Sequence, residues 1–261
     1  MVKQQDERSN AIEKALLILL AFRDDQPTWG VRELSAHLGF SPATVLRILR
    51  ILKTYEFVSQ DAQSKKYHLG NIYFSFFHAL QQTNPVTQAM LPFLERLRER
   101  TQETVHFNVI QGDERVCVNS LESRRQLKGS MPVGERSPLY AGASSKCLLA
   151  FSSIGIANEY LNGIEIIPVT ENTILNKTQL RKELEVIKAQ GYASSLGERS
   201  AGLGSLSAPV LNYDGEMLGC ISLAIPEMRF KDYDHRKFCI DALLEVTSSA
   251  SQHMGYPVSK G

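Results

Sequence analysis

The sequence predicts two domains of different fold classes joined by a helix. Between residues 10 and 56, apolar residues recur at helical spacing, and two short alternating runs follow at 57–60 and 67–69. Between residues 104 and 225, longer alternating runs are separated by turn residues, with helical segments before and after them. We therefore expect a mainly α-helical N-terminal domain with a β-hairpin, a linker helix, and an α+β domain with an antiparallel sheet.

The expected boundaries lie where these patterns change. They are a flexible tail at 1–9, a first domain at 10–69, a linker helix at 70–84, a second domain at 85–257 and a tail at 258–261. A chain of 261 residues has room for this arrangement, because one domain takes roughly 150 residues.

Composition excludes several classes of protein. The chain is 22% charged and 43% hydrophobic with a net charge of +1, so any surface that attracts nucleic acid must be a local one. No apolar run reaches the ~18 residues of a membrane span, and the N-terminus has no signal-peptide pattern. We therefore expect a cytoplasmic protein without a membrane partner. The four cysteines and six histidines are scattered, so we expect buried thiols, no metal site and no cofactor.

The first predicted helix begins with a capping box. Asn10 and Glu13 have the spacing that lets each side chain bond the other residue's backbone N–H. The apolar residues that repeat along this helix are Ile12, Ala15, Leu16, Leu19 and Leu20. The helix should end before Pro27.

Two further helices follow at short range. A helix at 31–38 should end at Gly39, which can adopt the left-handed conformation of a helix end. Ser41 is a good N-cap for the next helix, and Pro42 suits its first position. Small Ser35 at the crossing and apolar positions inside both helices are typical of a helix-turn-helix.

The third helix carries positive charge on one face. From Ser41 to Lys53 it contains Arg47 and Arg50 and no acidic residue. Val45, Ile48, Leu49 and Leu52 should face inward. Ala43 and Thr44 then face outward with the arginines, where arginine can contact guanine or phosphate and small residues can contact thymine methyls. The alternative interpretation is an ordinary solvated helix face.

A predicted hairpin after this helix favours DNA binding over that alternative. The alternating runs 57–60 and 67–69 flank a turn that contains Lys65 and Lys66, which could reach phosphates as a wing does. The order of elements is that of a winged helix-turn-helix. The predicted DNA-binding residues are Ser41, Pro42, Ala43, Thr44, Arg47, Arg50, Lys65 and Lys66.

The linker segment 70–84 has no charged residue. Tyr73, Phe76, Phe77 and Leu80 fall on one helical face, and such an apolar face marks an interface. It could pack on its own chain or on a second copy. We expect dimerisation through these four residues, because two winged helices recognise two half-sites about one DNA turn apart.

The remaining segment predicts a sheet with helices. We expect helices at 85–101, 144–151, 177–190 and 233–254, strand-like runs at 104–110, 115–121, 210–211 and 217–225, and an extended stretch at 126–133. This pattern suggests helices packed on one face of an antiparallel sheet.

The search for catalytic motifs in this segment finds none. Residues 142–146 place serine two residues before lysine rather than three, and 202–205 match neither a nucleophile elbow nor a dinucleotide fingerprint. Residues 141–145 precede a helix whose free N–H groups suit a carboxylate, and strand serines could orient a small ligand. The alternative is that these serines are ordinary cap and turn residues.

Several segments together resemble the IclR family of bacterial transcriptional regulators. They are 41–52 and 66–70 in the first domain and 134–146, 191–198, 207–210 and 220–226 in the second. Residues 228–230 and 254–256 resemble the corresponding segments in the branch of this family that includes regulators of sugar-acid catabolism. The resemblance implies a winged helix, a linker helix and a GAF-like effector-binding domain in a homodimer, or a tetramer built from two dimers.

The resemblance also implies a small-molecule effector, often an organic acid. The positions that match the family's effector site are Ala143, Ser144, Ser195, Ser205, Ser222 and Ala224. At Gly204 this chain lacks an arginine that many relatives carry, and Lys128, Arg136 or Arg199 could supply the positive charge instead.

We therefore expect a regulator that binds an operator in double-stranded DNA and is modulated by an effector, with repression favoured over activation. Two alternatives stay open at this point. One is an enzyme with an accessory winged-helix module, and the other is an architectural DNA-binding protein with a sensor domain that no longer binds ligand.

Overall fold

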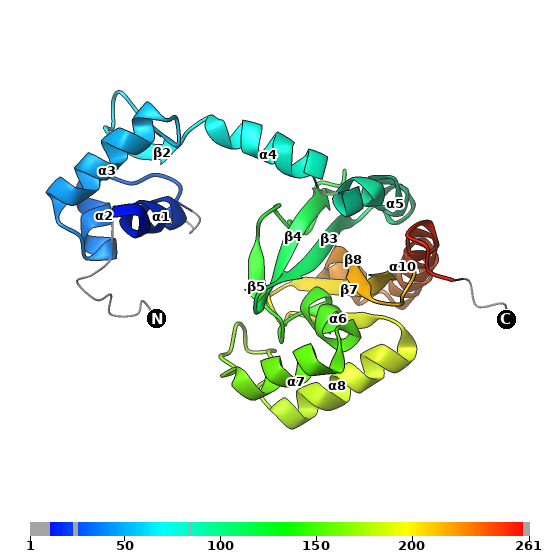
Figure 1. The fold of residues 1–261 in the computed structure, drawn as a ribbon. Helices are drawn as coiled ribbons and strands as arrows, with labels where there is room; N and C mark the ends of the chain where they lie inside the picture. Colours follow the sequence, from blue (N-terminus) through cyan, green and yellow to red (C-terminus); the bar gives the residue numbers. More distant parts are fainter. Residues whose placement is uncertain (1–10, 23–25, 84, 258–261) are drawn as a thin grey trace. The chain divides into compact units, whose positions relative to one another are not determined.

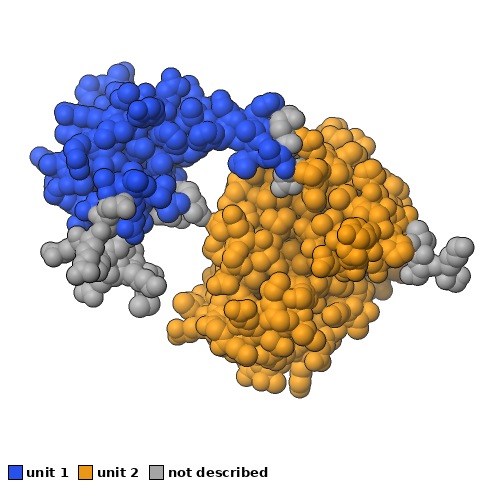
Figure 2. Space-filling model, viewed as in Figure 1, with its two compact units in different colours: residues 1–84 blue, residues 85–261 orange. Residues whose placement is uncertain are grey.

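The structure is a computed structural model that describes residues 11–22, 26–83 and 85–257. It divides into two compact units, residues 1–84 and residues 85–261 (Figure 2), and each is considered by itself. The predicted tails and the Asn10 half of the capping box lie outside the described residues. Among the described helices, none has the length and apolar character needed to cross a membrane.

The first unit begins with the three predicted helices, α1 (Ala11–Ala21), α2 (Val31–Leu38) and α3 (Pro42–Thr54). The start of α3 is set by Ser41, whose Oγ accepts a hydrogen bond from the Thr44 N–H at 3.2 Å. The turn before it uses Gly39, which has a φ of 71°. Ser35 on α2 donates its hydroxyl to the Phe40 carbonyl at 2.6 Å, which holds the turn against the helix. The helix-turn-helix is confirmed.

The wing is also confirmed, with one addition. Strands β1 (Val58–Gln60) and β2 (Tyr67–Leu69) pair antiparallel. Trp29 pairs with Tyr67 through two backbone hydrogen bonds of 2.9 and 2.8 Å, and its indole N–H donates to the Ala21 carbonyl at 3.1 Å. Trp29 therefore connects the wing to α1, a role that its place in the sequence did not suggest. Helix α4 (Ile72–Thr83) follows the wing.

The apolar residues of α1 do not all face the core. Ile18 and Ala21 are buried, whereas Ile12, Leu16 and Leu20 are exposed. Because α1 is apolar on nearly all sides, its periodicity does not select one buried face.

The second unit is built on a six-stranded antiparallel sheet (Figure 1). In sheet order its strands are β5 (Arg136–Pro138), β4 (Glu114–Leu121), β3 (Thr104–Gln111), β8 (Met217–Pro226), β7 (Leu203–Leu211) and β6 (Ala193–Leu196). Its helices are α5 (Pro85–Thr101), α6 (Ala143–Phe151), α7 (Ile154–Gly163), α8 (Lys177–Gln190), α9 (Glu227–Phe230) and α10 (Tyr233–His253). The α+β class with an antiparallel sheet is confirmed.

Helices cover both faces of this sheet, so the prediction of a single covered face is wrong. Ile221, Leu223 and Ile225 of β8 belong to one core with residues of α5 and α10. Cys220 of the same strand belongs to a second core with residues of α6, α7 and α8. Strand β8 is buried on both faces, because its successive side chains alternate between these two layers.

The structure also differs from the predicted elements at several segments. The stretch 126–133 forms no strand, and the edge of the sheet is β5 instead. Helix α7 and strand β6 were not predicted, because the first is short and the second is mostly serine and alanine. All four cysteines are buried, as predicted.

Gly204 on β7 has a packing reason to be glycine. A Cβ at this position would lie 2.1 Å from Cγ of Phe230, the last residue of α9. The ring of Phe230 is buried there and occupies the space that a side chain at 204 would need. The small size of residue 204 is therefore matched to a bulky neighbour.

We expect Gly204→Ala to destabilise the protein by about 1–3 kcal/mol, because the added methyl collides with an aromatic ring in a packed core. Gly163→Ala is the matched control, because a Cβ at Gly163 meets no atom within 4 Å. The free energies of unfolding from urea titrations measure both effects. Equal stability of the two variants would contradict this account of Gly204.

Candidate functional site

The outward face of α3 carries the predicted DNA-binding residues. Val45, Ile48, Leu49 and Leu52 are buried, whereas Arg47 and Arg50 are exposed. Ser41, Pro42 and Ala43 are also exposed at the start of the helix, and Thr44 is half-buried. The Thr44 hydroxyl lies 2.9 Å from Ser41 Oγ, so it belongs to the helix cap. The two arginines therefore share an open face.

The two lysines of the wing have different surroundings. Lys65 is exposed at the tip, with a φ of 59°. Lys66 Nζ forms an ion pair with Glu33 of α2 at 2.9 Å. The Gly30 backbone N–H and then Lys66 hold the pKa of the Glu33 carboxyl below its ordinary value. Lys65 is thus the more available cation for a phosphate.

The apolar face of α4 is only partly covered by its own unit. The rings of Tyr73 and Phe76 lie 5.9 and 5.8 Å from that of Phe57, measured between centroids. Phe77 and Leu80 remain 47% and 64% exposed. Packing of α4 on its own chain therefore covers Tyr73 and part of Phe76. It leaves Phe77 and Leu80 exposed.

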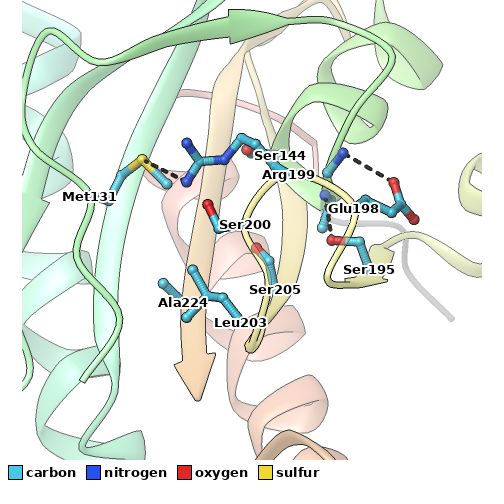
Figure 3. A pocket seen from close by; sticks show the side chains of 11 residues that line it. Met131, Ser144, Ser195, Glu198, Arg199, Ser200, Leu203, Ser205 and Ala224 are labelled. Atoms are coloured by element: carbon cyan, nitrogen blue, oxygen red, sulfur yellow. Dashed lines mark hydrogen bonds between the residues drawn. The ribbon is translucent and has the colours of Figure 1, made fainter. Parts of the chain in front are cut away.

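A small cavity in the second unit brings most of the predicted effector residues together (Figure 3). It is lined by Met131, Gly142, Ala143, Ser144, Ser195, Glu198, Arg199, Ser200, Leu203, Ser205 and Ala224. The cavity volume is about 20 Å³, which is room for little more than one water molecule. A larger ligand would require some of these side chains to move.

Ser222 is the predicted effector residue that does not line this cavity. Its hydroxyl is buried in β8, where it lies 2.7 Å from Ser207 Oγ and accepts a hydrogen bond from Asn108 Nδ2 at 3.1 Å. Its role in ligand binding stays a prediction.

The protein's own side chains occupy the N-terminus of α6. Glu198 accepts hydrogen bonds from the Gly142 N–H at 3.1 Å and from Lys146 Nζ at 2.6 Å. Ser195 Oγ accepts the Ala143 N–H at 2.9 Å. The position predicted to suit a ligand's carboxylate thus already holds a carboxylate, that of Glu198. Sequence analysis missed this residue, which is 56 positions from the N–H group it accepts.

Of the three cations considered as replacements for the missing arginine, Arg199 lines the cavity. Lys128 pairs with Glu122, and Arg136 pairs with Glu114, each at 2.6 Å.

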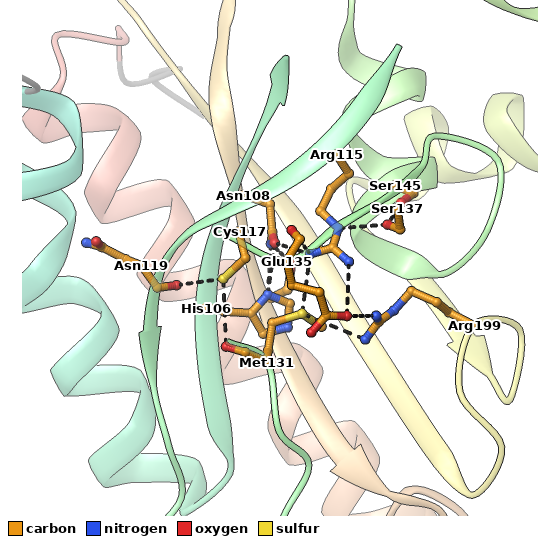
Figure 4. A network of polar contacts seen from close by, with 11 residues as sticks. His106, Asn108, Arg115, Cys117, Asn119, Met131, Glu135, Ser137, Ser145 and Arg199 are labelled. Atoms are coloured by element: carbon orange, nitrogen blue, oxygen red, sulfur yellow. Dashed lines mark hydrogen bonds and ion pairs between the residues drawn. The ribbon is translucent and has the colours of Figure 1, made fainter. Parts of the chain in front are cut away.

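A buried polar network lies beside the cavity (Figure 4). Arg115 of β4 is completely buried and donates from Nε to Ser137 Oγ at 2.9 Å. Both the side-chain Oδ1 and the Nδ2 of Asn108 lie within 3.1 Å of His106 Nδ1. Burial, followed by the positive charge of Arg115, lowers the pKa of His106 to about 3, so the imidazole is neutral near pH 7. Sequence analysis missed this network because its members come from three strands, β3, β4 and β5, that are neighbours only in the folded sheet.

Comparisons with known proteins decide the family. The chain matches the IclR helix-turn-helix domain over residues 11–62 and the C-terminal domain of the bacterial transcriptional regulator IclR over residues 77–252. It belongs to the IclR family.

The similar proteins are regulators of this family. The transcriptional regulator KdgR of Escherichia coli is 30% identical over 255 residues, which cover 97% of this chain and 95% of KdgR. The transcriptional repressor AllR of Escherichia coli is 27% identical over 228 residues, or 86% of this chain and 83% of AllR. Among solved structures, the Thermotoga maritima IclR has a TM-score of 0.76 at 26% identity, covering 95% of this chain and 99% of that one.

One neighbour shares the fold and was solved with a ligand. It is an IclR homologue from Microbacterium hydrocarbonoxydans in complex with 4-hydroxybenzoate, with a TM-score of 0.78 at 18% identity over 93% of this chain and 100% of that one. The family models and the regulators that match this chain confirm a DNA-binding transcriptional regulator, and they overturn the alternative of an enzyme.

The buried imidazole predicts a pH dependence of stability. In the unfolded chain a histidine takes up a proton near pH 6.5, whereas folded His106 stays neutral down to about pH 3. The unfolded state therefore binds more protons below pH 6.5, and stability is lost as the pH falls. Between pH 6.5 and about 5, the free energy of unfolding of the wild type should fall more steeply than that of His106→Gln, by up to about 1.4 kcal/mol per pH unit. Denaturant titrations at several pH values measure both slopes, and equal slopes would contradict a neutral buried imidazole.

Proposed function

We propose that this IclR-family protein is a cytoplasmic repressor whose operator binding is modulated by a small organic acid. The observation that carries the proposal is the cavity of the second unit, where five of the six predicted effector residues meet beside Arg199. Hydroxyl groups and a half-buried guanidinium suit a ligand with a carboxylate and further oxygen atoms. Repression is supported by AllR, which is a repressor.

The DNA contacts would come from α3 and the wing. Arg47 and Arg50 are exposed on a helix face without acidic residues, and the small residues at the helix start allow close approach to base edges. Lys65 would contact phosphate from the tip of the wing. The formal net charge of +1 leaves this local cluster as the source of attraction to DNA.

We propose that the functional unit is a homodimer, in which a second copy covers the open part of α4, and that two dimers can assemble into a tetramer. Phe77 and Leu80 leave apolar area in solvent, and one winged helix makes few base contacts by itself. A two-fold pair recognises two half-sites, which multiplies specificity.

Arg47→Ala should weaken specific operator binding by about 1–3 kcal/mol, because a bidentate contact to guanine is lost. Fluorescence anisotropy on the DNA upstream of the protein's own gene, beside a scrambled duplex, measures the loss. Arg124→Ala, which removes an exposed arginine from the other unit, is the charge-matched control. An equal loss on both duplexes would limit Arg47 to phosphate contacts, and no loss on either would overturn the role of α3.

Lys65→Ala should weaken binding to all duplexes alike and reduce the salt slope by about one, because it removes a phosphate contact. The same anisotropy experiment across salt concentrations gives this slope. Lys66→Ala should have the smaller effect, because Lys66 already pairs with Glu33. The reverse order of the two lysines would contradict this assignment.

Phe77→Asp should shift the protein toward monomer, because a charge cannot be buried in an apolar interface without a partner. Sedimentation equilibrium gives the dissociation constant. Phe238→Asp is the matched control, since Phe238 of α10 is 45% exposed and Phe77 is 47% exposed. A dimer that is unchanged by Phe77→Asp would place the interface elsewhere.

An organic acid that binds in the cavity should protect the protein against heat. At a concentration 100 times the dissociation constant it adds about 2.7 kcal/mol of stability. Thermal melts with a panel of organic acids that includes 4-hydroxybenzoate measure this effect. Ser205→Leu should abolish the protection by filling the cavity, whereas Ser248→Leu on the exposed face of α10 should retain it. Full protection of Ser205→Leu would exclude this cavity as the effector site.

A further inference from the structure

Two arginines beside the cavity share one carboxylate. Glu135 pairs with Arg199, and its Oε1 also lies 4.0 Å from Nη2 of Arg115. In the described part of the chain, Glu135 is the only carboxylate that forms an ion pair with either guanidinium. The neighbouring His106 is neutral and cannot contribute charge near pH 7. Within this group of three, two positive charges and one negative charge leave an excess of one positive charge, since Glu198 of the cavity lining is paired with Lys146.

The buried arginine is incompletely satisfied. Nη1 of Arg115 has two distant oxygen acceptors, the Asn108 Oδ1 and the Glu135 carbonyl, each at 3.4 Å, and one weak sulfur acceptor, the Met131 Sδ at 3.3 Å. Nη2 of Arg115 is buried without a hydrogen-bond partner among the described residues, and so is Nε2 of His106. A buried cation normally has close acceptors, because its desolvation is costly. The network thus has unused hydrogen-bonding capacity beside a surplus cation.

The network and the cavity are connected through Met131 and Arg199. Both residues line the cavity, and Arg199 Nη2 lies 3.7 Å from Met131 Sδ, the atom that Arg115 also contacts (Figures 3 and 4). Glu135 can leave this position more readily than its partners. Its side chain is 29% exposed, whereas that of Arg115 is 0% exposed. A movement of Glu135 toward solvent would free the donors of Arg199, which lines the cavity.

We propose that Glu135 is an internal substitute for the effector's carboxylate, and that an acidic effector displaces it from Arg199 and Arg115. The inference rests on the proposed effector site and adds its mode of regulation. In the ligand-free protein Glu135 neutralises Arg199. When an acid binds, its carboxylate takes over the guanidinium of Arg199, and the surplus charge of Arg115 strengthens the attraction. Competition by Glu135 then selects against neutral molecules, which cannot replace its charge.

Acetate tests this mechanism, because it is the carboxylate group that all organic acids share. Glu135→Gln removes the competing charge and keeps the shape of the side chain. Glu245→Gln is the control for net charge, since Glu245 pairs with Arg96 and Arg100 on the other face of the sheet. Methyl-¹³C labelling of the six methionines reports binding, with the Met131 signal assigned from Met131→Leu. Acetate and acetamide are titrated at an ionic strength held constant with sodium chloride.

The expected result is that acetate shifts the Met131 signal and binds Glu135→Gln about tenfold more tightly than the wild type or Glu245→Gln, because a like charge at the site is gone. Acetamide should show no such gain, and adding Arg199→Gln to Glu135→Gln should remove it. Equal acetate affinity of Glu135→Gln and the wild type would overturn the proposal and make the Glu135 pairs structural only. So would an equal gain for acetamide.

Operator binding is measured on the same preparations, which separates this inference from the proposed function. If acetate affinity is unaffected by Glu135→Gln while the wild type binds its operator specifically, only the role of Glu135 is wrong. If the wild type binds no duplex specifically, the proposed function is wrong, whatever acetate does.

Discussion

The alternation of side chains along β8 is the constraint on which the C-terminal unit depends. Because helices cover both faces of the sheet, every second residue of this strand must suit a different layer. Ile221, Leu223 and Ile225 contribute only apolar side chains to one layer. The opposite layer receives Ser222 and Ala224 from the same strand, together with His106 from its neighbour. The apolar layer stabilises the fold, and the mixed layer contains the small cavity and its polar side chains.

Buried charge in the mixed layer is tolerated because it is paired, though unequally. Lys146 is fully buried and has two carboxylates, Glu198 at 2.6 Å and Glu183 at 3.1 Å. Arg115 is equally buried and has only a share of Glu135. A buried ion pair adds little net stability compared with apolar packing, so its retention suits a specific role. Lys146 has close carboxylate partners and holds the loop that carries Glu198 against the start of α6. Arg115 has only a distant carboxylate partner and is the arginine that a ligand could complement.

The positively charged side chains of the two units differ in their exposure to solvent. In the first unit, Arg47, Arg50 and Lys65 stand in solvent, where their charges remain available to a polyanion. In the second unit, Arg115 and Arg199 lie in surroundings of low dielectric constant, where one small anion has a large effect. In the proposed function, the same kind of side chain serves attraction to a long phosphate backbone in one unit and selection of a small molecule in the other.

The sequence by itself determined the elements whose signals are short-range. Caps, periodicity and turn residues predicted α2, α3, the wing and α8, because a cap such as Ser41 bonds to a backbone group three residues away. Only the tertiary structure decided which distant groups meet. It placed helices on both faces of the sheet, Lys66 against Glu33, and Glu198 at the start of α6. These partners are separated by tens of residues, and many combinations of charges could satisfy the same pattern. Their choice depends on how strands and helices pack, which no local spacing encodes.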